Sequence, residues 1–227
     1  MTDITLLYCT GNLLPEITAE KIRQNLLTVT ENKYPVISVS QKPIDFGENI
    51  CIGEMENCRY SFFKQMLLGA QSVKTKFIVH VDDDSLYTPE HFTFRPKDEK
   101  TFIYNTNTWL SANKLYWKPP YALSGMFCHI SPTKALIANL SKRFEMYPEK
   151  PVDDRHWGEP GKFDTEFGIP NANVETFKTV LPLVSFEYRG SISGKRKRFG
   201  LTDPKSFCYD LEPFGNAKKL YEKYWKK

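Results

Sequence analysis

The sequence lacks any long run of apolar residues. A membrane-spanning helix needs roughly 20 consecutive apolar residues, and no stretch of this chain approaches that length. The first residues, with Asp3 beside a strand-like run, are unlike a secretion signal. We therefore expect a soluble, cytoplasmic protein that has no contact with a membrane.

Cysteine is also scarce, and its pattern excludes two classes of protein. The five cysteines are an odd number and form no CxxC pair. Small secreted domains held by disulfides usually have even numbers, and structural zinc sites usually contain closely spaced pairs. Free thiols that are mostly buried are therefore expected.

The remaining composition is that of an ordinary globular protein. Of the 227 residues, 41% are hydrophobic and 14% are aromatic, which is enough to bury one sizeable core. The chain has no internal repeat and no low-complexity linker. We expect a single domain over residues 1–200, with residues 201–227 forming a basic helical extension packed on the same domain.

Positive charge is unevenly distributed along the chain. The formal net charge is +4, yet residues 186–227 contain 11 Lys and Arg against 5 Asp and Glu. That segment is therefore at +6, which leaves −2 for residues 1–185. A local surplus of this kind favours an anionic partner, such as a phosphate, a nucleotide or a nucleic acid.

Strand-like and helix-like segments alternate through the first 92 residues. Short apolar runs predict strands at 4–8, 35–40 and 77–81, and apolar stripes at helical spacing predict helices at 15–29 and 59–73. This order predicts an α/β fold with a mainly parallel central sheet flanked by helices. Ligands of such sheets bind at the carboxyl ends of the strands.

The second half of the chain is less regular. Further strands are expected at 101–104, 121–130 and 180–188, a helix at 132–144 capped by Ser131, and a short helix from about residue 216. Residues 41–49 are too rich in Pro, Gly and Asn to be regular. Residues 148–173 form a long acidic loop, and long loops in compact domains are usually functional.

Three consecutive aspartates, Asp82, Asp83 and Asp84, follow the strand at 77–81 without a spacer; we call them the acidic triplet. In a partly dehydrated cleft their mutual repulsion raises their pKa values, and a divalent cation is the natural partner of such carboxylates. The alternative interpretation is a solvated acidic turn, in which Asp84 or Ser85 caps the next helix.

Several segments together resemble the GT-A type of nucleotide-sugar glycosyltransferases, in a group common in phages and bacteria. The resemblance covers most of residues 4–200, and residues 65–92, which contain a DxD motif within the acidic triplet, are its most specific part. The segments that carry it are 38–43, 46–50, 64–70, 81–87, 90–92, Asn105, Trp109 and 159–161.

The resemblance implies a GT-A-like fold and sugar transfer from a nucleoside diphosphate donor, UDP-linked by preference. It implies that Asp82 and Asp84 approach the ribose and a Mn²⁺ or Mg²⁺ ion that bridges the diphosphate. Relatives often offer a histidine ligand after the last strand, where this chain has Arg189; an arginine binds diphosphate directly. The implied donor-binding residues are Thr10, Asn12, Ser40, Gln41, Gly47, Asn49, Arg59, Asp82, Asp83, Arg189 and Lys195. For Arg59, a plain surface role is the alternative.

An inverting transfer needs a carboxylate that takes the proton of the acceptor hydroxyl. Glu159, Asp164 and Glu166, all in the long acidic loop, are the candidates, with preference for Asp164 or Glu166. The alternative is that these acids are only solvated.

The basic run Lys195–Arg198 leaves the acceptor open. It is a solvated loop, a loop that folds over the donor diphosphate, or a contact with the phosphates of a nucleic acid. In the last case the favoured acceptor is a 5-hydroxymethyl pyrimidine in double-stranded phage DNA, reached in the host cytoplasm by base flipping. A glycan or protein acceptor is the second hypothesis. A non-catalytic DNA-binding or nucleotide-sugar-binding module is the third.

Overall fold

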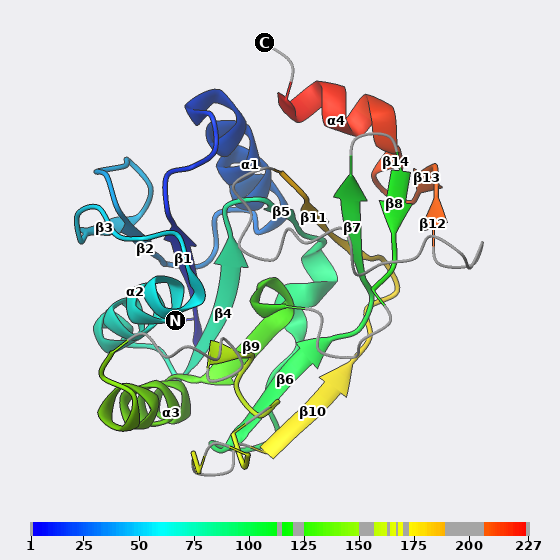
Figure 1. Cartoon of the computed structure of the whole chain (residues 1–227). Coiled ribbons are helices and arrows are strands. Elements are labelled where there is room, and N and C mark those ends of the chain that lie inside the picture. The colour runs from blue at the N-terminus through cyan, green and yellow to red at the C-terminus, as the bar shows by residue number, and fades with distance from the viewer. Residues whose placement is uncertain are drawn as a thin grey trace.

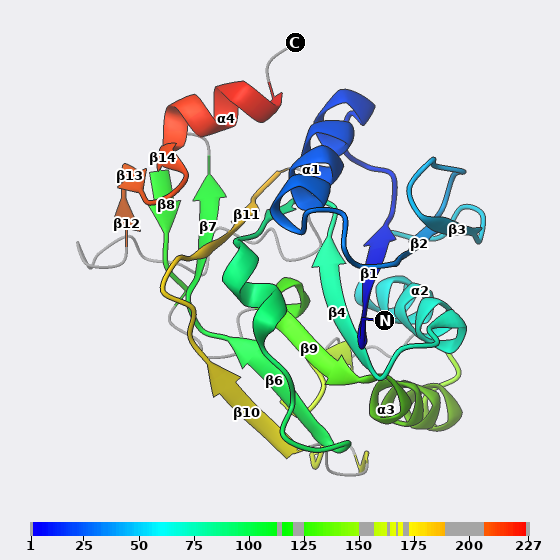
Figure 2. The same cartoon turned by 180° about the vertical axis from the view of Figure 1, so that it is seen from behind.

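The computed structural model (Figures 1 and 2) describes residues 2–112, 115–119, 125–149, 157–162, 164–166, 168–169, 173–188 and 207–225. Four α-helices are present in this part of the chain: α1 (Glu16–Val29), α2 (Arg59–Ser72), α3 (Thr133–Met146) and α4 (Ala217–Trp225). Two short 3-10 helices are η1 (Pro89–Thr93) and η2 (Met126–Cys128).

A seven-stranded sheet forms the centre of the molecule. Its spatial order is β10 (Asn173–Phe177), β6 (Thr101–Asn105), β9 (His129–Pro132), β4 (Phe77–Asp82), β1 (Ile4–Thr10), β2 (Val36–Ser40) and β3 (Glu48–Cys51). All pairings are parallel except those of β9, which runs antiparallel to β4 and β6. The prediction of a mixed α/β domain with a mainly parallel central sheet is confirmed.

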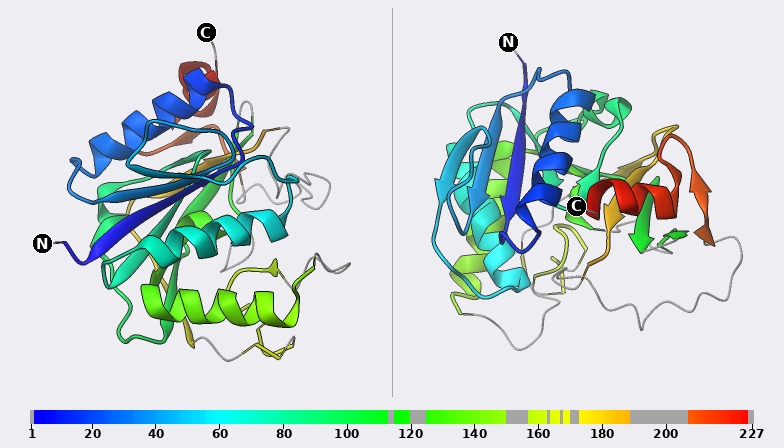
Figure 3. Two further views of the ribbon diagram at one scale, coloured as in Figure 1. Left: turned by 90° about the vertical axis from the view of Figure 1, so that its left-hand side faces the viewer. Right: turned by 90° about the horizontal axis from the view of Figure 1, so that it is seen from above.

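Helices cover this sheet on both sides. Figure 3 shows α1 on one side and α2 and α3 on the other. Helix α2 lies directly on β1 and β2. Gly69 permits this close packing, since a Cβ atom there would lie 2.4 Å from Leu7 Cδ1 and 2.7 Å from Val39 Cγ2.

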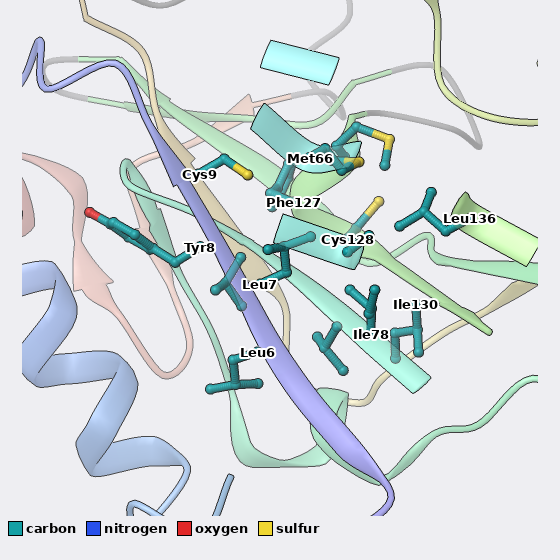
Figure 4. Packing of buried hydrophobic residues seen from close by; sticks show 14 of the residues in the cluster. Leu6, Leu7, Tyr8, Cys9, Met66, Ile78, Phe127, Cys128, Ile130 and Leu136 are labelled. Atoms are coloured by element: carbon teal, nitrogen blue, oxygen red, sulfur yellow. The ribbon is translucent and has the colours of Figure 1, made fainter. Parts of the chain in front are cut away.

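The main core lies on both faces of the sheet and includes residues of α1, α2 and α3. Every residue of β1 is buried, so side chains that alternate between the two faces of this strand all pack inside the protein. Figure 4 shows Leu7, Met66, Ile78, Ile130 and Leu136 around this strand and its neighbours. A central strand buried on both faces fixes the register of β4 beside it, and therefore the position of the acidic triplet.

A second sheet extends from the first. Its order is β12 (Phe207–Cys208), β8 (Leu115–Trp117), β7 (Thr108–Ala112), β11 (Leu183–Phe186) and β5 (Ser85–Leu86). Strand β5 directly follows the acidic triplet and pairs antiparallel with β11. The second sheet therefore fixes the chain directly after Asp84.

The C-terminal segment packs against the first helix. Leu220 and Tyr224 of α4 lie in one apolar cluster with Ile22 of α1, and the hydroxyl of Thr18 donates to the Tyr224 carbonyl (2.9 Å). Besides α4, this segment contains β12 and the hairpin of β13 (Asp210–Leu211) and β14 (Gly215–Asn216), which the sequence did not predict. The expected domain boundary at residue 200 lies outside the described residues.

Several local predictions need correction. Residues 48 and 49, expected to be irregular, begin β3, which is specified by pairing with β2. Of the expected strand 121–130, residues 121–124 lie outside the described part of the chain; Met126–Cys128 form η2, and His129 and Ile130 are extended, in β9. Ser131 does not cap α3 but lies in β9, and Pro132 precedes the helix without a side-chain cap.

All five cysteines are free thiols, as expected, although only Cys9 and Cys128 are buried. Among the helices of the described residues, none has the length and apolar character required to cross a membrane.

Candidate functional site

A cleft opens where β1, β2 and β4 reach their carboxyl ends. Its cavity volume is about 220 Å³, and the whole acidic triplet lines it. The other lining residues come from the end of β1 and the loop after it, the loop after β2, the segment before α2 and the first half of that helix, β7, Pro119, Gly125 and η2, the segment at 157–159, and β11 with the two residues after it. Of the residues predicted to face a ligand at this edge, the acidic triplet, Gln41 and Arg59 line the cleft.

The central carboxylate of the triplet faces β1. Thr10 Oγ1 donates a short hydrogen bond to Asp83 Oδ2 (2.5 Å) and accepts one from the Asn12 amide (2.9 Å). Asp83 is only 9% exposed. Thr10 is thus hydrogen-bonded to both Asp83 and Asn12, two of the residues expected to bind the donor, although Thr10 itself does not line the cleft.

The third carboxylate is held from the second sheet. Both Ser85 Oγ and Ser185 Oγ donate to Asp84 Oδ1 (3.0 Å each), and the Phe186 amide donates to the Asp84 carbonyl (2.8 Å). One carboxylate oxygen is therefore engaged twice, while Oδ2 accepts no side-chain hydrogen bond from the described residues and keeps its acceptor capacity there.

The first carboxylate is less constrained. The Asp82 amide donates to Tyr87 Oη (2.9 Å), but Oδ1 is buried and has no hydrogen-bond partner among the described residues. Within the described residues, His80 Nε2 is the basic group that lies against this oxygen, 3.4 Å away. Burial lowers the pKa of His80 to about 4, so the imidazole is neutral at pH 7 and does not compensate the charge of Asp82.

The environment of the triplet increases its affinity for protons, and carboxylates that are costly to leave uncompensated are also good ligands for a cation. Burial is the main cause that raises the pKa of Asp84 to about 7 and that of Asp83 to about 6. Burial, followed by the charges of Asp84 and Asp83, holds the pKa of Asp82 well above its usual range. Repulsion from neighbouring aspartates contributes to the raised pKa of Asp82 and of Asp84, whereas the raised pKa of Asp83 is due to burial. These buried carboxyls do not fit the alternative of a solvated turn.

A hard divalent cation fits this donor set. The triplet offers carboxylate oxygens, an orphaned buried oxygen on Asp82 and a spare oxygen on Asp84. In the described part of the chain, no group of three His, Cys, Asp or Glu side chains is close enough to enclose a metal by itself. Mg²⁺ commonly uses one or two carboxylates and takes its other ligands from water and substrate phosphates, so two carboxylates are enough for such a site.

The loop after β2 forms one wall of the cleft. Asn12 Oδ1 accepts hydrogen bonds from the amides of Gln41 and Lys42 (2.9 Å each). Gln41 lines the cleft, and its Oε1 accepts from the Met55 amide (3.1 Å). Asn12 therefore shapes the wall that Gln41 presents.

The start of α2 forms another wall. Arg59, the first residue of the helix, lines the cleft, where the helix N-terminus and the guanidinium both favour an anion. From the same helix, Gln65 Nε2 donates to the Thr10 carbonyl (2.9 Å) and fixes the end of β1 against α2.

Three expected donor-binding residues stand behind the cleft instead of lining it. The Asn49 amide group donates to Ser38 Oγ and Ser40 Oγ (2.9 Å each), and Ser40 is fully buried. Gly47 has a φ of 64°, and a Cβ there would lie 2.4 Å from the Val36 carbonyl oxygen. These residues hold the ends of β2 and β3 and the loop between them in place.

The candidate bases separate in space. Glu159 lines the cleft and forms an ion pair with Lys162 (3.3 Å). Glu166 is exposed and is not among the lining residues.

Asp164, the third candidate base, is buried in contacts that stabilise the fold. It is 2% exposed and lies in an ion pair with Arg143 (2.5 Å), and its other oxygen accepts from Asn139 Nδ2 (3.0 Å) and the Gly161 amide (2.6 Å). Since both carboxylate oxygens are engaged away from the cleft, the preference for Asp164 as the base passes to Glu159.

Sequence reasoning missed several residues of the cleft. Ser185 and Glu187 come from β11 and the residue after it, and Phe62 and Trp157 add aromatic walls. Glu187 stands two residues after Ser185, so in an extended segment both side chains lie on the same face. This spacing was the sequence signal that could have placed Glu187 beside Ser185. Arg189 and Lys195 lie outside the described residues.

No family model matches the sequence, and no curated protein matches it. Among solved structures, a glycosyltransferase involved in glycosylation of the major capsid of PBCV-1 is similar over 81% of this chain and 92% of that chain, at 11% identity and a TM-score of 0.49. S. aureus TarS 1-349 in complex with UDP-GlcNAc is similar over 84% of this chain and 60% of that chain, at 12% identity and a TM-score of 0.48.

The bifunctional IspDF of Campylobacter jejuni is also similar, over 78% of this chain and 50% of that chain, at 12% identity and a TM-score of 0.44. The chain thus spans only about half to three fifths of the matched IspDF and TarS chains. Likenesses this distant carry no functional argument, so we argue the function from the residues of the cleft.

Proposed function

We propose that the protein is a glycosyltransferase that moves a sugar from a nucleoside diphosphate sugar, UDP-linked by preference, to a hydroxyl acceptor. The observation that carries the proposal is the acidic triplet, whose three residues follow one another at the carboxyl end of β4 in a mainly parallel sheet and all line one cleft. Buried carboxyls without a compensating cation are costly, and a cation with a diphosphate would relieve that cost.

In this proposal Asp82 and Asp84 hold a Mn²⁺ or Mg²⁺ ion, and Asp83 stays bound to Thr10 and orients the end of β1. The cation, when bound, supplies Lewis-acid stabilisation of the departing nucleoside diphosphate. Gln41 contacts the nucleoside from the loop wall, with Asn12 supporting it. Arg59 faces the diphosphate from the N-terminus of α2, where anions are favoured.

We assign removal of the proton from the acceptor hydroxyl to a carboxylate that lines the cleft outside the triplet. Glu159 is the one candidate base from the acidic loop that lines the cleft. Glu187 lies in the same cleft beside the triplet and is the second choice. A positioned carboxylate in hydrogen-bond reach of the hydroxyl contributes typically 10²- to 10⁴-fold to the rate.

For the acceptor, the sequence-based proposal of a 5-hydroxymethyl pyrimidine in DNA rests on the basic run 195–198, outside the described residues. The described lining of the cleft has six acidic side chains and one cationic side chain, Arg59. Such a lining repels a polyanion, so DNA would have to be held by the basic segment alone. Binding of hydroxymethylated duplex DNA that weakens steeply between low and moderate salt supports DNA as the acceptor; salt-independent binding contradicts it and favours a glycan or protein.

The test of the transferase is release of UDP from a panel of UDP-sugars in the presence of Mn²⁺. We expect slow release by the wild-type protein and none by Asp84→Ala, while Asp45→Ala, an exposed site in the loop after β2, keeps the wild-type rate. Wild-type protein that binds UDP-sugars without releasing UDP, with or without acceptors, would indicate a binding module instead. Release retained by Asp84→Ala would remove this aspartate from the site.

A further inference from the structure

His80 is an unusual residue for its place in the fold. It lies in the middle of β4, two residues before Asp82, so the two side chains leave the strand on the same face. The ring is fully buried, and all the other residues of β4 before Asp82 are apolar. An apolar side chain would fill this place without burying polar nitrogens, so packing alone does not account for a histidine.

The polar atoms of this pair face each other. His80 Nε2 lies 3.4 Å from Asp82 Oδ1, and neither buried atom has a well-formed hydrogen bond in the part of the chain that the structure describes; the backbone of Met126 is a second polar neighbour of the ring. Buried polar atoms in native proteins are nearly always paired. Closing this contact by a few tenths of an ångström would satisfy both atoms together.

Of the two side chains, that of Asp82 has more room to move, because the His80 ring is packed inside the protein. The imidazole packs edge-on against Phe62, with ring centroids 5.3 Å apart and an interplanar angle of 90°. The Asp82 amide is held by Tyr87 Oη, while the Asp82 side chain is 23% exposed and faces the cleft. Rotation of that side chain towards the fixed ring would direct its second oxygen into the cleft.

We propose that His80 is a positioning residue, which donates its Nε2–H to Asp82 Oδ1 and turns Asp82 Oδ2 towards the cation and diphosphate of the donor. The effect of His80 on donor binding rests on the proposed function, whereas the hydrogen bond between His80 and Asp82 does not. It assigns a role to a buried side chain that touches neither the donor nor the acceptor. Outer contacts of this kind typically contribute 10- to 100-fold to the affinity of a metal site.

The contact can be tested without any ligand by long-range ¹H–¹⁵N NMR of the histidine side chains. We expect His80 to carry its proton on Nε2, and Asp82→Ala to shift the Nε2 resonance. His91, which receives a hydrogen-bond contact from Asn105 at Nδ1 (3.5 Å), is the internal control and should keep its resonances. A proton on His80 Nδ1, or a His80 spectrum unchanged in Asp82→Ala, would overturn the proposed contact.

The consequence can be tested by calorimetric titration of UDP in the presence of Mn²⁺. We expect His80→Leu to weaken binding about 10-fold or more, and His80→Gln, which can donate from a similar position, to restore most of the affinity. In the Asp82→Ala background the His80→Leu change should have no further effect, because His80 acts through Asp82. Additive effects of the two substitutions would show that His80 acts only on the fold.

The two proposals fail in different ways. Absence of UDP binding by the wild-type protein would contradict the proposed function, and the NMR experiment would still decide the contact. Wild-type binding together with full binding by a folded His80→Leu variant would contradict the role of His80 alone.

Discussion

At the scale of single residues, the acidic triplet combines a cost to folding with a capacity for binding. Thr10 fixes Asp83, two serines fix Asp84, and Asp82 keeps an orphaned oxygen. Each aspartate therefore has a separate environment, although the three are consecutive in sequence. The separate anchors keep the carboxyls beside one another in spite of their repulsion.

The first prediction concerns pH. The pKa of Asp84 is raised to about 7 from an ordinary value of 3.8, so the folded protein binds this proton more tightly than the unfolded chain. The resulting stabilisation is complete at low pH and is lost as the pH rises from about 4 through about 7, by up to about 1.4 kcal/mol per pH unit. Urea unfolding at several pH values, without added divalent cation, measures it.

The matched variants for this prediction are Asp84→Asn and Asp45→Asn. Asp84→Asn removes the titrating group, so its unfolding free energy should fall less steeply over the same pH interval. Asp45→Asn changes an exposed carboxyl and should keep the wild-type profile. Identical slopes for Asp84→Asn and the wild-type protein would show that this carboxyl does not titrate there.

The second prediction concerns Asp164, whose ion pair with Arg143 is almost fully buried. Arg143→Met leaves an uncompensated buried carboxylate, and loss of one partner of such a pair typically costs about 3–5 kcal/mol of unfolding free energy. Denaturant unfolding measures the loss. Affinity for UDP at a temperature where the variant is folded should be unchanged, and a selective loss of UDP affinity without destabilisation would return Asp164 to the donor site.

At the scale of elements, the sequence predicted those that have a strong local pattern. Both early helices and the strands β1, β2 and β4 are found close to their expected bounds. Strand β3 was missed because it is half exposed and is defined by its pairing with β2. The segment before β9 was predicted as a strand because Met126–Cys128 are apolar. A short apolar run shows that residues are buried, but it does not distinguish a strand from a helical turn.

The third prediction belongs to the contact of α2 with the sheet. Gly69→Ala places a methyl group within 2.4 Å of Leu7 Cδ1, so α2 must move away from β1 and β2. Overpacking of this kind typically costs about 1–3 kcal/mol, and denaturant unfolding should show it. Gln71→Ala, at an exposed position of the same helix, should change the unfolding free energy by less than about 0.5 kcal/mol; an equally small effect of Gly69→Ala would mean that α2 packs less closely.

At the scale of the whole molecule, distant segments complete the site. Gln65 holds the end of β1 from 55 residues away, and Ser185 holds Asp84 from 101 residues away. The sequence predicted the acidic triplet because its members are adjacent, whereas these partners carry no local signal. For the same reason it could not separate Glu159, in the cleft, from Asp164, in a buried ion pair.

The fourth prediction concerns the docking of the C-terminal helix on the N-terminal one. Leu220 of α4 is 6% exposed within the cluster that contains residues of α1. Leu220→Ala should lower the unfolding free energy by about 2–5 kcal/mol, whereas Lys219→Ala, at an exposed position of the same helix, should have little effect. A Leu220→Ala variant with wild-type stability would mean that α4 contributes nothing to the fold.

The central claim is that the acidic triplet and the cleft beside it bind a nucleoside diphosphate through a divalent cation. Anomalous X-ray scattering from crystals grown with UDP and Mn²⁺ tests it most directly. The account predicts a manganese peak at the carboxylates of Asp82 and Asp84, adjacent to the diphosphate, with the nucleoside towards Gln41. UDP bound elsewhere, or bound in the cleft with no manganese at the triplet, would contradict it.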